Sequence, residues 1–302
     1  MTKITSIIDA IYSIVRPALP LLATLSYLMG YYWRQILDLI YLQFYNLRII
    51  PPLRIDVIAS IFLAGTYSNM LNSYKDSTDT DRINEFIKDY VNPVLKYNMT
   101  KETVWSIAAL SSVFSILIVA FTAPLVIPFI ILGLLISTAY SYYPRLKSYA
   151  PLDIVANTLG LFLVPFIMGW TSHSKLEDLP IPTITGFSLI ASSFYTLTAI
   201  VDYDSDLKNN IRTIAVKLGP RNSAILCAAL HFLGILLSLD FLKDHLHALA
   251  YLIMDLLLYL DLIRDPAPKN VLETIKKLVV ISVSYIAIMA VYFAWIAKLM
   301  SG

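Results

Sequence analysis

The sequence predicts an all-α fold, a polytopic membrane bundle of about nine transmembrane helices. Three observations lead to this prediction. Of the 302 residues, 58% are hydrophobic and only 15% are charged, whereas a soluble domain carries about 25% charged residues. The mean hydropathy is +0.69. The apolar residues are also gathered into runs of roughly 20, which is the length that crosses a bilayer as a helix.

Nine apolar runs have the length and composition of membrane spans. They are residues 17–33, 55–75, 103–122, 123–143, 152–171, 182–202, 222–239, 245–264 and 274–298. The third and fourth runs meet at Thr122-Ala123-Pro124, which forms either a tight hairpin or a kink. Pro165, Gly160 and Gly169 lie inside the fifth run, where neighbouring helices can satisfy any freed backbone groups. We expect one domain over residues 1–302.

Composition excludes several other classes of protein. The net charge of +2 is too small for a nucleic-acid-binding protein, and the basic residues lie in loops rather than on one helix face. The single cysteine, Cys227, cannot form an intramolecular disulfide and is expected to be a buried apolar residue. The four histidines show no metal-ligand spacing near the acidic residues. The N-terminus lacks a cleavable signal-peptide pattern.

The distribution of basic residues predicts the orientation in the membrane. With nine spans, 17 of the 23 lysines and arginines fall on the side of the N-terminus, in the N-terminal tail, the loops 74–102, 144–151, 203–221 and 265–273, and their flanks. The remaining six are Arg34, Arg48, Arg54, Lys175, Lys243 and Lys298. The positive-inside rule therefore predicts a protein of the cell membrane whose N-terminus faces the cytoplasm.

A first acidic cluster closes the second predicted span. If that helix continues for one to two turns, Asn69, Asn72, Asp76 and Asp79 follow one another at steps of three, four and three. Such steps place side chains on one face of a helix.

A second acidic cluster closes the sixth predicted span, on the same side of the membrane. Tyr195, Thr198, Asp202 and Asp206 follow at steps of three, four and four, with Asp204 turned away. Paired carboxylates at helical spacing suit Mg²⁺, which prefers one or two carboxylates together with phosphate oxygens and water. The alternative is that these aspartates are ordinary solvated residues at helix ends. That alternative leaves two matched clusters on one membrane face unexplained.

A third element follows the fourth predicted span, at residues 140–147 (YSYYPRLK). An aromatic belt with basic anchors would by itself account for this composition. Beside two carboxylate clusters, however, Lys147 offers a cation for a leaving diphosphate, and Tyr140 offers an aromatic face for a carbocation.

With these motifs the sequence resembles the UbiA superfamily of intramembrane prenyltransferases. That family has N-x-x-x-D-x-x-x-D after its second helix, Y-S-x-P-P-R-x-K after its fourth and D-x-x-x-D after its sixth. The last motif is intact as residues 202–206 (DYDSD), and the second is matched by residues 140–147. Arg16-Pro17 resembles a family arginine that reaches toward the diphosphate. The resemblance covers nearly the whole chain and is closer to archaeal than to bacterial members.

The first motif departs from the family pattern. Asn72 and Asp76 stand where expected, but Thr80 follows where the second aspartate should be, flanked by Asp79 and Asp81. Helical geometry favours Asp79 as the ligand, and the arginine that follows favours Asp81, so both stay candidates. The arginine-proline pair of many members is replaced by Asn92-Pro93, which leaves Lys88 or Arg82 to supply the charge.

The resemblance implies a Mg²⁺-dependent enzyme that moves a polyprenyl group, such as geranylgeranyl, from its diphosphate to a lipophilic acceptor, a quinone precursor or a lipid. Two Mg²⁺ ions would be bound by Asp76, Asp79 or Asp81, Asp202 and Asp206. The diphosphate would be bound by Arg16, Arg82, Lys88, Lys147 and Lys208. Asn72 would orient a metal-bound group, and Tyr140 would shield the carbocation. The prenyl and acceptor pocket would be lined by Asn69, Asn157, Tyr195 and Thr198.

The main rival is an ion- or proton-coupled transporter, since carboxylates in membrane proteins often mark ion pathways. Transporter sites lie near the bilayer midplane, whereas these aspartates stand at helix exits beside basic loops. A purely structural membrane subunit would leave the matched clusters without a role. The hydropathy excludes a soluble terpene synthase. Membrane lipids are expected partners, and no nucleic acid or obligate protein partner is inferred.

Overall fold

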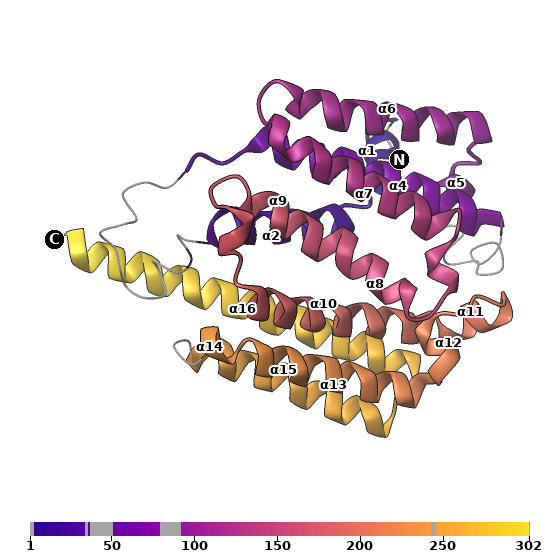
Figure 1. Cartoon of the computed structure of the whole chain (residues 1–302). Helices are drawn as coiled ribbons and strands as arrows, with labels where there is room; N and C mark the ends of the chain where they lie inside the picture. The colour runs from indigo at the N-terminus through magenta and orange to yellow at the C-terminus, as the bar shows by residue number, and fades with distance from the viewer. Residues whose placement is uncertain (1–2, 34–35, 37–50, 79–91, 243–245, 302) are drawn as a thin grey trace. The chain divides into compact units, whose positions relative to one another are not determined.

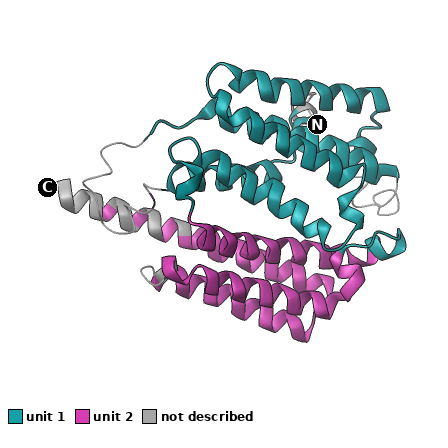
Figure 2. Cartoon of the chain, in the orientation of Figure 1, with its two compact units in different colours: residues 1–33, 51–179, 205–213 teal, residues 34–50, 180–204, 214–302 magenta. Residues whose placement is uncertain are grey.

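The computed structural model describes residues 3–33, 36, 51–78, 92–242 and 246–301. The described residues are almost entirely helical, which confirms the predicted all-α class (Figure 1). Contacts divide the chain into two compact units (Figure 2). Unit 1 comprises residues 1–33, 51–179 and 205–213, and unit 2 comprises residues 34–50, 180–204 and 214–302. The two units are described separately below.

Unit 1 contains the helices that carry the first acidic motif and the tyrosine-rich element. In chain order they are α1 (Lys3–Val15), α2 (Ala18–Tyr31), α4 (Ile55–Thr78), α5 (Pro93–Lys96), α6 (Lys101–Ala120), η3 (Pro124–Val126), α7 (Ile127–Ser141), η4 (Leu146–Ser148), α8 (Leu152–Thr158), η5 (Leu159–Leu163), α9 (Val164–Trp170) and η6 (Leu176–Asp178). The short α11 (Tyr203–Lys208) spans the boundary between the units and carries the end of the second acidic motif.

Unit 2 contains α10 (Ile181–Val201), α12 (Ile214–Leu218), α13 (Pro220–Leu237), α14 (Leu239–Leu242), α15 (Leu246–Arg264) and α16 (Pro268–Ser301). Helix α13 packs against both α10 and α15, and α16 packs against α10 and α15. At the centre, the Ser193 hydroxyl lies 3.1 Å from the Tyr259 hydroxyl and 3.5 Å from His231 Nδ1. All three side chains are buried, so His231 has a structural place in the unit.

Each of the nine predicted spans contains a helix in the described part of the chain. Five helical segments are long and apolar enough to cross a membrane by themselves: Lys101–Ala120, Pro124–Ser141, Leu152–Trp170, Ile181–Val201 and Pro220–Leu237. A sixth arises if the bent pair Ile8–Val15 and Ala18–Tyr31, with an angle of 57°, is counted as one span. The membrane bundle is therefore confirmed, and the exact number of nine spans stays a prediction.

The fifth predicted span is helical throughout but changes its winding in the middle. It runs through α8, the single π-helical turn η5 and α9, and Pro165 stands just after the π turn. Proline has no backbone N–H and its ring clashes with the carbonyl four residues earlier, so a locally wider turn relieves the conflict. The sequence anticipated a tolerated proline here.

Two glycines let α2 and α9 cross closely in unit 1. A Cβ atom at Gly30 of α2 would overlap the backbone carbonyl of Phe166, and one at Gly169 of α9 would overlap the carbonyl of Tyr27. Unit 2 repeats the arrangement, because a Cβ at Gly234 of α13 would lie 2.6 Å from the carbonyl oxygen of Gly186 in α10. Small residues let helices approach closely in a membrane, where packing rather than the hydrophobic effect drives their association.

These crossings generate a prediction about stability. Gly169→Ala should lower the stability of the detergent-solubilised protein by about 1–3 kcal/mol, because backbone atoms cannot move aside as a side chain could. Gly133→Ala is the matched control, since nothing lies within 4 Å of a Cβ built there. The control should be neutral or slightly stabilising, as alanine favours helix more than glycine does. Thermal unfolding measures both, and equal effects would contradict the close-crossing interpretation.

Candidate active site

The last turns of α4 present a buried polar stripe. Asn69, Asn72 and Asp76 follow at the predicted steps of three and four, and Ser73 lies beside them. Asn69, Ser73 and Asp76 are buried, and the Asp76 side chain is only 7% exposed. A buried carboxylate is costly unless it is paired and hydrogen-bonded, so its partners define the site.

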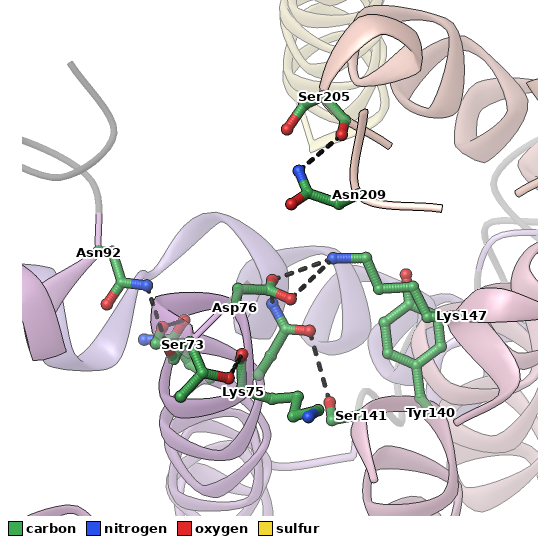
Figure 3. Close-up of polar contacts among 12 residues, drawn as sticks. Ser73, Lys75, Asp76, Asn92, Tyr140, Ser141, Lys147, Ser205 and Asn209 are labelled. Atoms are coloured by element: carbon green, nitrogen blue, oxygen red, sulfur yellow. Dashed lines mark hydrogen bonds and ion pairs between the residues drawn. The ribbon is translucent and has the colours of Figure 1, made fainter. Parts of the chain in front are cut away.

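Asp76 is held by one cation and one amide. The Lys147 ammonium lies 3.0 Å from each carboxylate oxygen of Asp76 (Figure 3). The Asn72 side-chain amide donates to Asp76 Oδ2 at 2.8 Å. Asn72 is in turn oriented by Ser141, whose hydroxyl donates to Asn72 Oδ1 at 3.4 Å. The first acidic motif is thereby joined to the end of α7 and to η4.

The loop after α7 brings Lys147 to this position. Arg145 has a left-handed backbone, with φ 62° and ψ 63°, which turns the chain sharply before η4. The turn is closed by Ser148 N–H, which donates to the Arg145 carbonyl at 2.8 Å. One step further, Ala150 N–H donates to the Arg212 carbonyl at 3.1 Å. This last bond ties the loop to the segment that follows the second acidic motif.

Asp206 lies in this same unit, on the short helix α11, and is buried. Ile211 N–H donates to its carbonyl at 2.9 Å and closes the turn after the helix. Burial alone would lower the pKa of Lys147, but Asp76, Tyr140 and Asp206 outweigh that effect, and the pKa is raised above the ordinary lysine value. Residues of both acidic motifs therefore share one electrostatic environment with a lysine that remains charged.

Arg16 and Asn69 form a separate clamp at the junction of α1 and α2. The Asn69 amide donates to the carbonyls of Ile14 at 2.6 Å and Ser13 at 3.3 Å, which end α1. Its oxygen accepts from Arg16 Nη1 at 3.4 Å and from the Ser73 hydroxyl at 3.3 Å. Both the nitrogen and the oxygen of the Asn69 amide therefore form hydrogen bonds within the protein, and the nitrogen holds the end of α1. The predicted place of Asn69 in a substrate pocket stays a prediction. Arg16 has φ 46°, a strained backbone for a residue with a side chain.

Tyr140 and Asn157 also meet in unit 1, since the Asn157 amide donates to the Tyr140 hydroxyl at 3.3 Å. The sequence analysis missed Asp153, which is buried in the first turn of α8 and interacts electrostatically with Tyr140. Its spacing of four residues from Asn157 could have indicated it. Ser141 and Asn92 were also missed as site residues. Asn92 caps α5 and donates to the Ser73 carbonyl at 2.8 Å.

The remaining predicted residues are placed as follows. Tyr195, Thr198 and Asp202 lie in unit 2, where Asp202 ends α10 and Thr198 is exposed. Lys208 is exposed in unit 1. Asp79, Asp81, Arg82 and Lys88 lie outside the described residues.

The chemistry of unit 1 fits a hard divalent cation. The available metal ligands are carboxylate and amide oxygens, which Mg²⁺ prefers. The Lys147 ammonium already occupies a position where a cation binds Asp76. Within the described ranges, no three His, Cys, Asp or Glu side chains gather to hold a metal by themselves. Mg²⁺ does not require such a cage, because substrate phosphates and water complete its six ligands.

Comparison with known families identifies the relationships of the chain. The sequence profile of the UbiA prenyltransferase family matches residues 45–271, which include the tyrosine-rich element and both acidic motifs. The chain belongs to the UbiA prenyltransferase family. The resemblance inferred from the motifs is confirmed, and so is the assignment as an integral membrane protein.

Several solved structures share the fold of this chain. A UbiA homologue from Archaeoglobus fulgidus bound to GPP and Mg²⁺ superimposes with a TM-score of 0.65 at 18% identity, covering 97% of this chain and 100% of that one. A structure of digeranylgeranylglyceryl phosphate synthase superimposes with a TM-score of 0.62 at 16% identity, covering 94% and 97%. At these identities the likeness shows the fold alone.

A curated relative matches part of the chain by sequence. A probable homogentisate phytyltransferase 2 of the chloroplast from Oryza sativa subsp. japonica is 32% identical over 160 residues. The match spans 49% of this chain and 41% of the rice protein.

The buried Asp76–Lys147 pair generates a prediction by double-mutant cycle. In metal-free buffer, Lys147→Met should cost about 3 kcal/mol, because it leaves a buried charge without its partner. Adding Asp76→Asn should recover most of that loss. Thermal unfolding of the wild type, both single variants and the double variant measures the coupling. Additive effects would mean that the pair contributes no net interaction.

Proposed function

We propose that this chain transfers a polyprenyl group from its diphosphate to a lipophilic acceptor, a quinone precursor or a membrane lipid, with a divalent metal ion at the acidic motifs. The observation that carries the proposal is the buried Asp76 carboxylate, which shares its electrostatic environment with Lys147 and with Asp206 of the second motif. Family membership gives no support to the transporter alternative.

In this proposal Asp76, Asp206 and Asp202, with Asp79 or Asp81, bind up to two Mg²⁺ ions, and Asn72 holds Asp76 in orientation. When bound, Mg²⁺ neutralises the charge of the diphosphate as it leaves. Lys147 and Arg16 bind the diphosphate oxygens, and the family resemblance adds Lys208, Arg82 and Lys88 as further candidate cations.

The chain's own residues also protect the reacting carbon. As the allylic C–O bond breaks, its electron pair leaves with the diphosphate, and a nucleophile on the acceptor bonds to the same carbon. Tyr140, held by Asn157, excludes water from the cation, because water would convert it to an alcohol. An isoprenyl diphosphate as substrate is supported by one structural neighbour, the UbiA homologue from Archaeoglobus fulgidus, which was solved with GPP and Mg²⁺.

A prediction about activity tests this function. The purified chain should release diphosphate from geranylgeranyl diphosphate and prenylate a membrane-lipid or quinone extract with Mg²⁺ or Mn²⁺, and EDTA should abolish both. Asp76→Asn should lose about 10²-fold or more of the rate. Asp204→Asn is the matched control, because Asp204 is an exposed carboxylate between the two motif aspartates. Full turnover in chelator would contradict the proposal.

A prediction about topology tests the proposed cytoplasmic face of the site. Single cysteines at Ser77 and Ser205, in a Cys227→Ser background, should react with a membrane-impermeant thiol reagent only from the cytoplasmic side. A cysteine at Ser172 should react only from the opposite side. Mg²⁺ with an unreactive diphosphate analogue should slow labelling at the first two positions and leave the third unchanged.

Labelling of all three cysteines from one side would overturn the nine-span orientation. Correct sidedness without protection by the analogue would keep the orientation and place the diphosphate elsewhere.

A further inference from the structure

The Lys147 ammonium occupies the position beside Asp76 that a metal ion would need. Lys147 Nζ lies 3.0 Å from Oδ1 and 3.0 Å from Oδ2, so neither oxygen is turned away from it. Oδ2 also accepts the Asn72 amide at 2.8 Å. The Lys147 side chain is 15% exposed and that of Asp76 is 7% exposed. In this state the charge of Asp76 is already balanced by Lys147.

The backbone that carries Lys147 is fixed, whereas its side chain is long. Tyr149 N–H donates to the Leu146 carbonyl at 3.1 Å, and Ala150 N–H to the Arg212 carbonyl at 3.1 Å. These bonds fix the backbone before and after Lys147. The ammonium ends a flexible four-carbon stem. It can therefore leave Asp76 by rotation of side-chain bonds, with no change in the loop.

A divalent ion and this ammonium compete for the same oxygens. Mg²⁺ takes oxygen ligands at about 2.0–2.1 Å, which would place two like charges side by side in a poorly solvated site if the ammonium stayed. Asp206 supplies further negative charge nearby. A bound diphosphate adds several acceptor oxygens within the same site, and these give the displaced ammonium a new partner.

We propose that Lys147 is an internal counter-cation that rests on Asp76 in the ligand-free protein and passes to the diphosphate when metal and diphosphate bind together. The inference rests on the proposed function and adds a coupling to it. The metal binds weakly alone, because it must displace Lys147 from Asp76 before a diphosphate is present to receive the ammonium. The diphosphate removes that obstacle, and by reciprocity each ligand strengthens the other by the same factor.

The test measures binding of Mn²⁺ to the detergent-purified full chain by electron paramagnetic resonance, with and without inorganic pyrophosphate. In the wild type, pyrophosphate should tighten Mn²⁺ binding by about 10-fold or more. In Lys147→Met, Mn²⁺ alone should bind about 10-fold tighter than in the wild type, and the coupling should fall toward one. Lys96→Met is the matched control, since Lys96 forms an ion pair of 2.8 Å with a different carboxylate, Asp9. It should behave as the wild type.

A second measurement needs no variant. An amine-reactive reagent followed by mass spectrometry should label Lys147 of the wild type slowly without ligands, faster with saturating Mn²⁺, and slowly again when pyrophosphate is added. Labelling that Mn²⁺ leaves unchanged would overturn the inference. So would a folded Lys147→Met protein that binds Mn²⁺ no tighter than the wild type. A wild type that binds no Mn²⁺ even with pyrophosphate would instead contradict the proposed function itself.

Discussion

The Asp76 carboxylate can be buried only beside a cation, and much of unit 1 depends on meeting that requirement. Lys147 meets it from the loop after α7, which must turn sharply at Arg145 to reach α4. In the same loop, Ala150 N–H donates to the Arg212 carbonyl and so ties the loop to the segment that contains Asp206. The Asp76–Lys147 pair and this backbone bond together bring residues far apart in the sequence into one environment.

The polar stripe of α4 serves structure and chemistry with different residues. Asn69 joins α4 to α1, and the Ser73 carbonyl accepts from Asn92 at the start of α5. Asn72 and Asp76, one turn further along, contact α7 and η4. Because the neighbouring residues fix the helix end on several sides, the Asp76 carboxylate has a defined position before any ligand arrives. Such preorganisation is what a charge-stabilising site requires.

The sequence predicted the fold class and most of unit 1's site because both follow from local periodicity. Apolar runs of span length gave the helices, and steps of three and four put Asn72 and Asp76 on one face. Periodicity says nothing about which lysine will reach a carboxylate 71 residues away. Lys147 was a candidate because it follows the fourth span on the acidic side of the membrane, and the family motif then supported it. Asn69 was expected at a pocket, which stays a prediction. In the structure its amide donates to carbonyls at the end of α1, a contact set by the bend at Arg16 that no helical pattern encodes. Asp153 was missed because one aspartate in the first turn of a helix is ordinary.

The bend between α1 and α2 has a consequence for engineering. Arg16 holds a positive φ of 46°, which glycine adopts without strain and arginine does not. A search for thermostable variants would therefore tend to select glycine at this position, since it relaxes the backbone. Such a variant would lose the guanidinium that contacts Asn69 beside the site. Selection for heat resistance would favour glycine at position 16, whereas selection for turnover would favour arginine. Stability screens of this chain should therefore keep Arg16 unchanged.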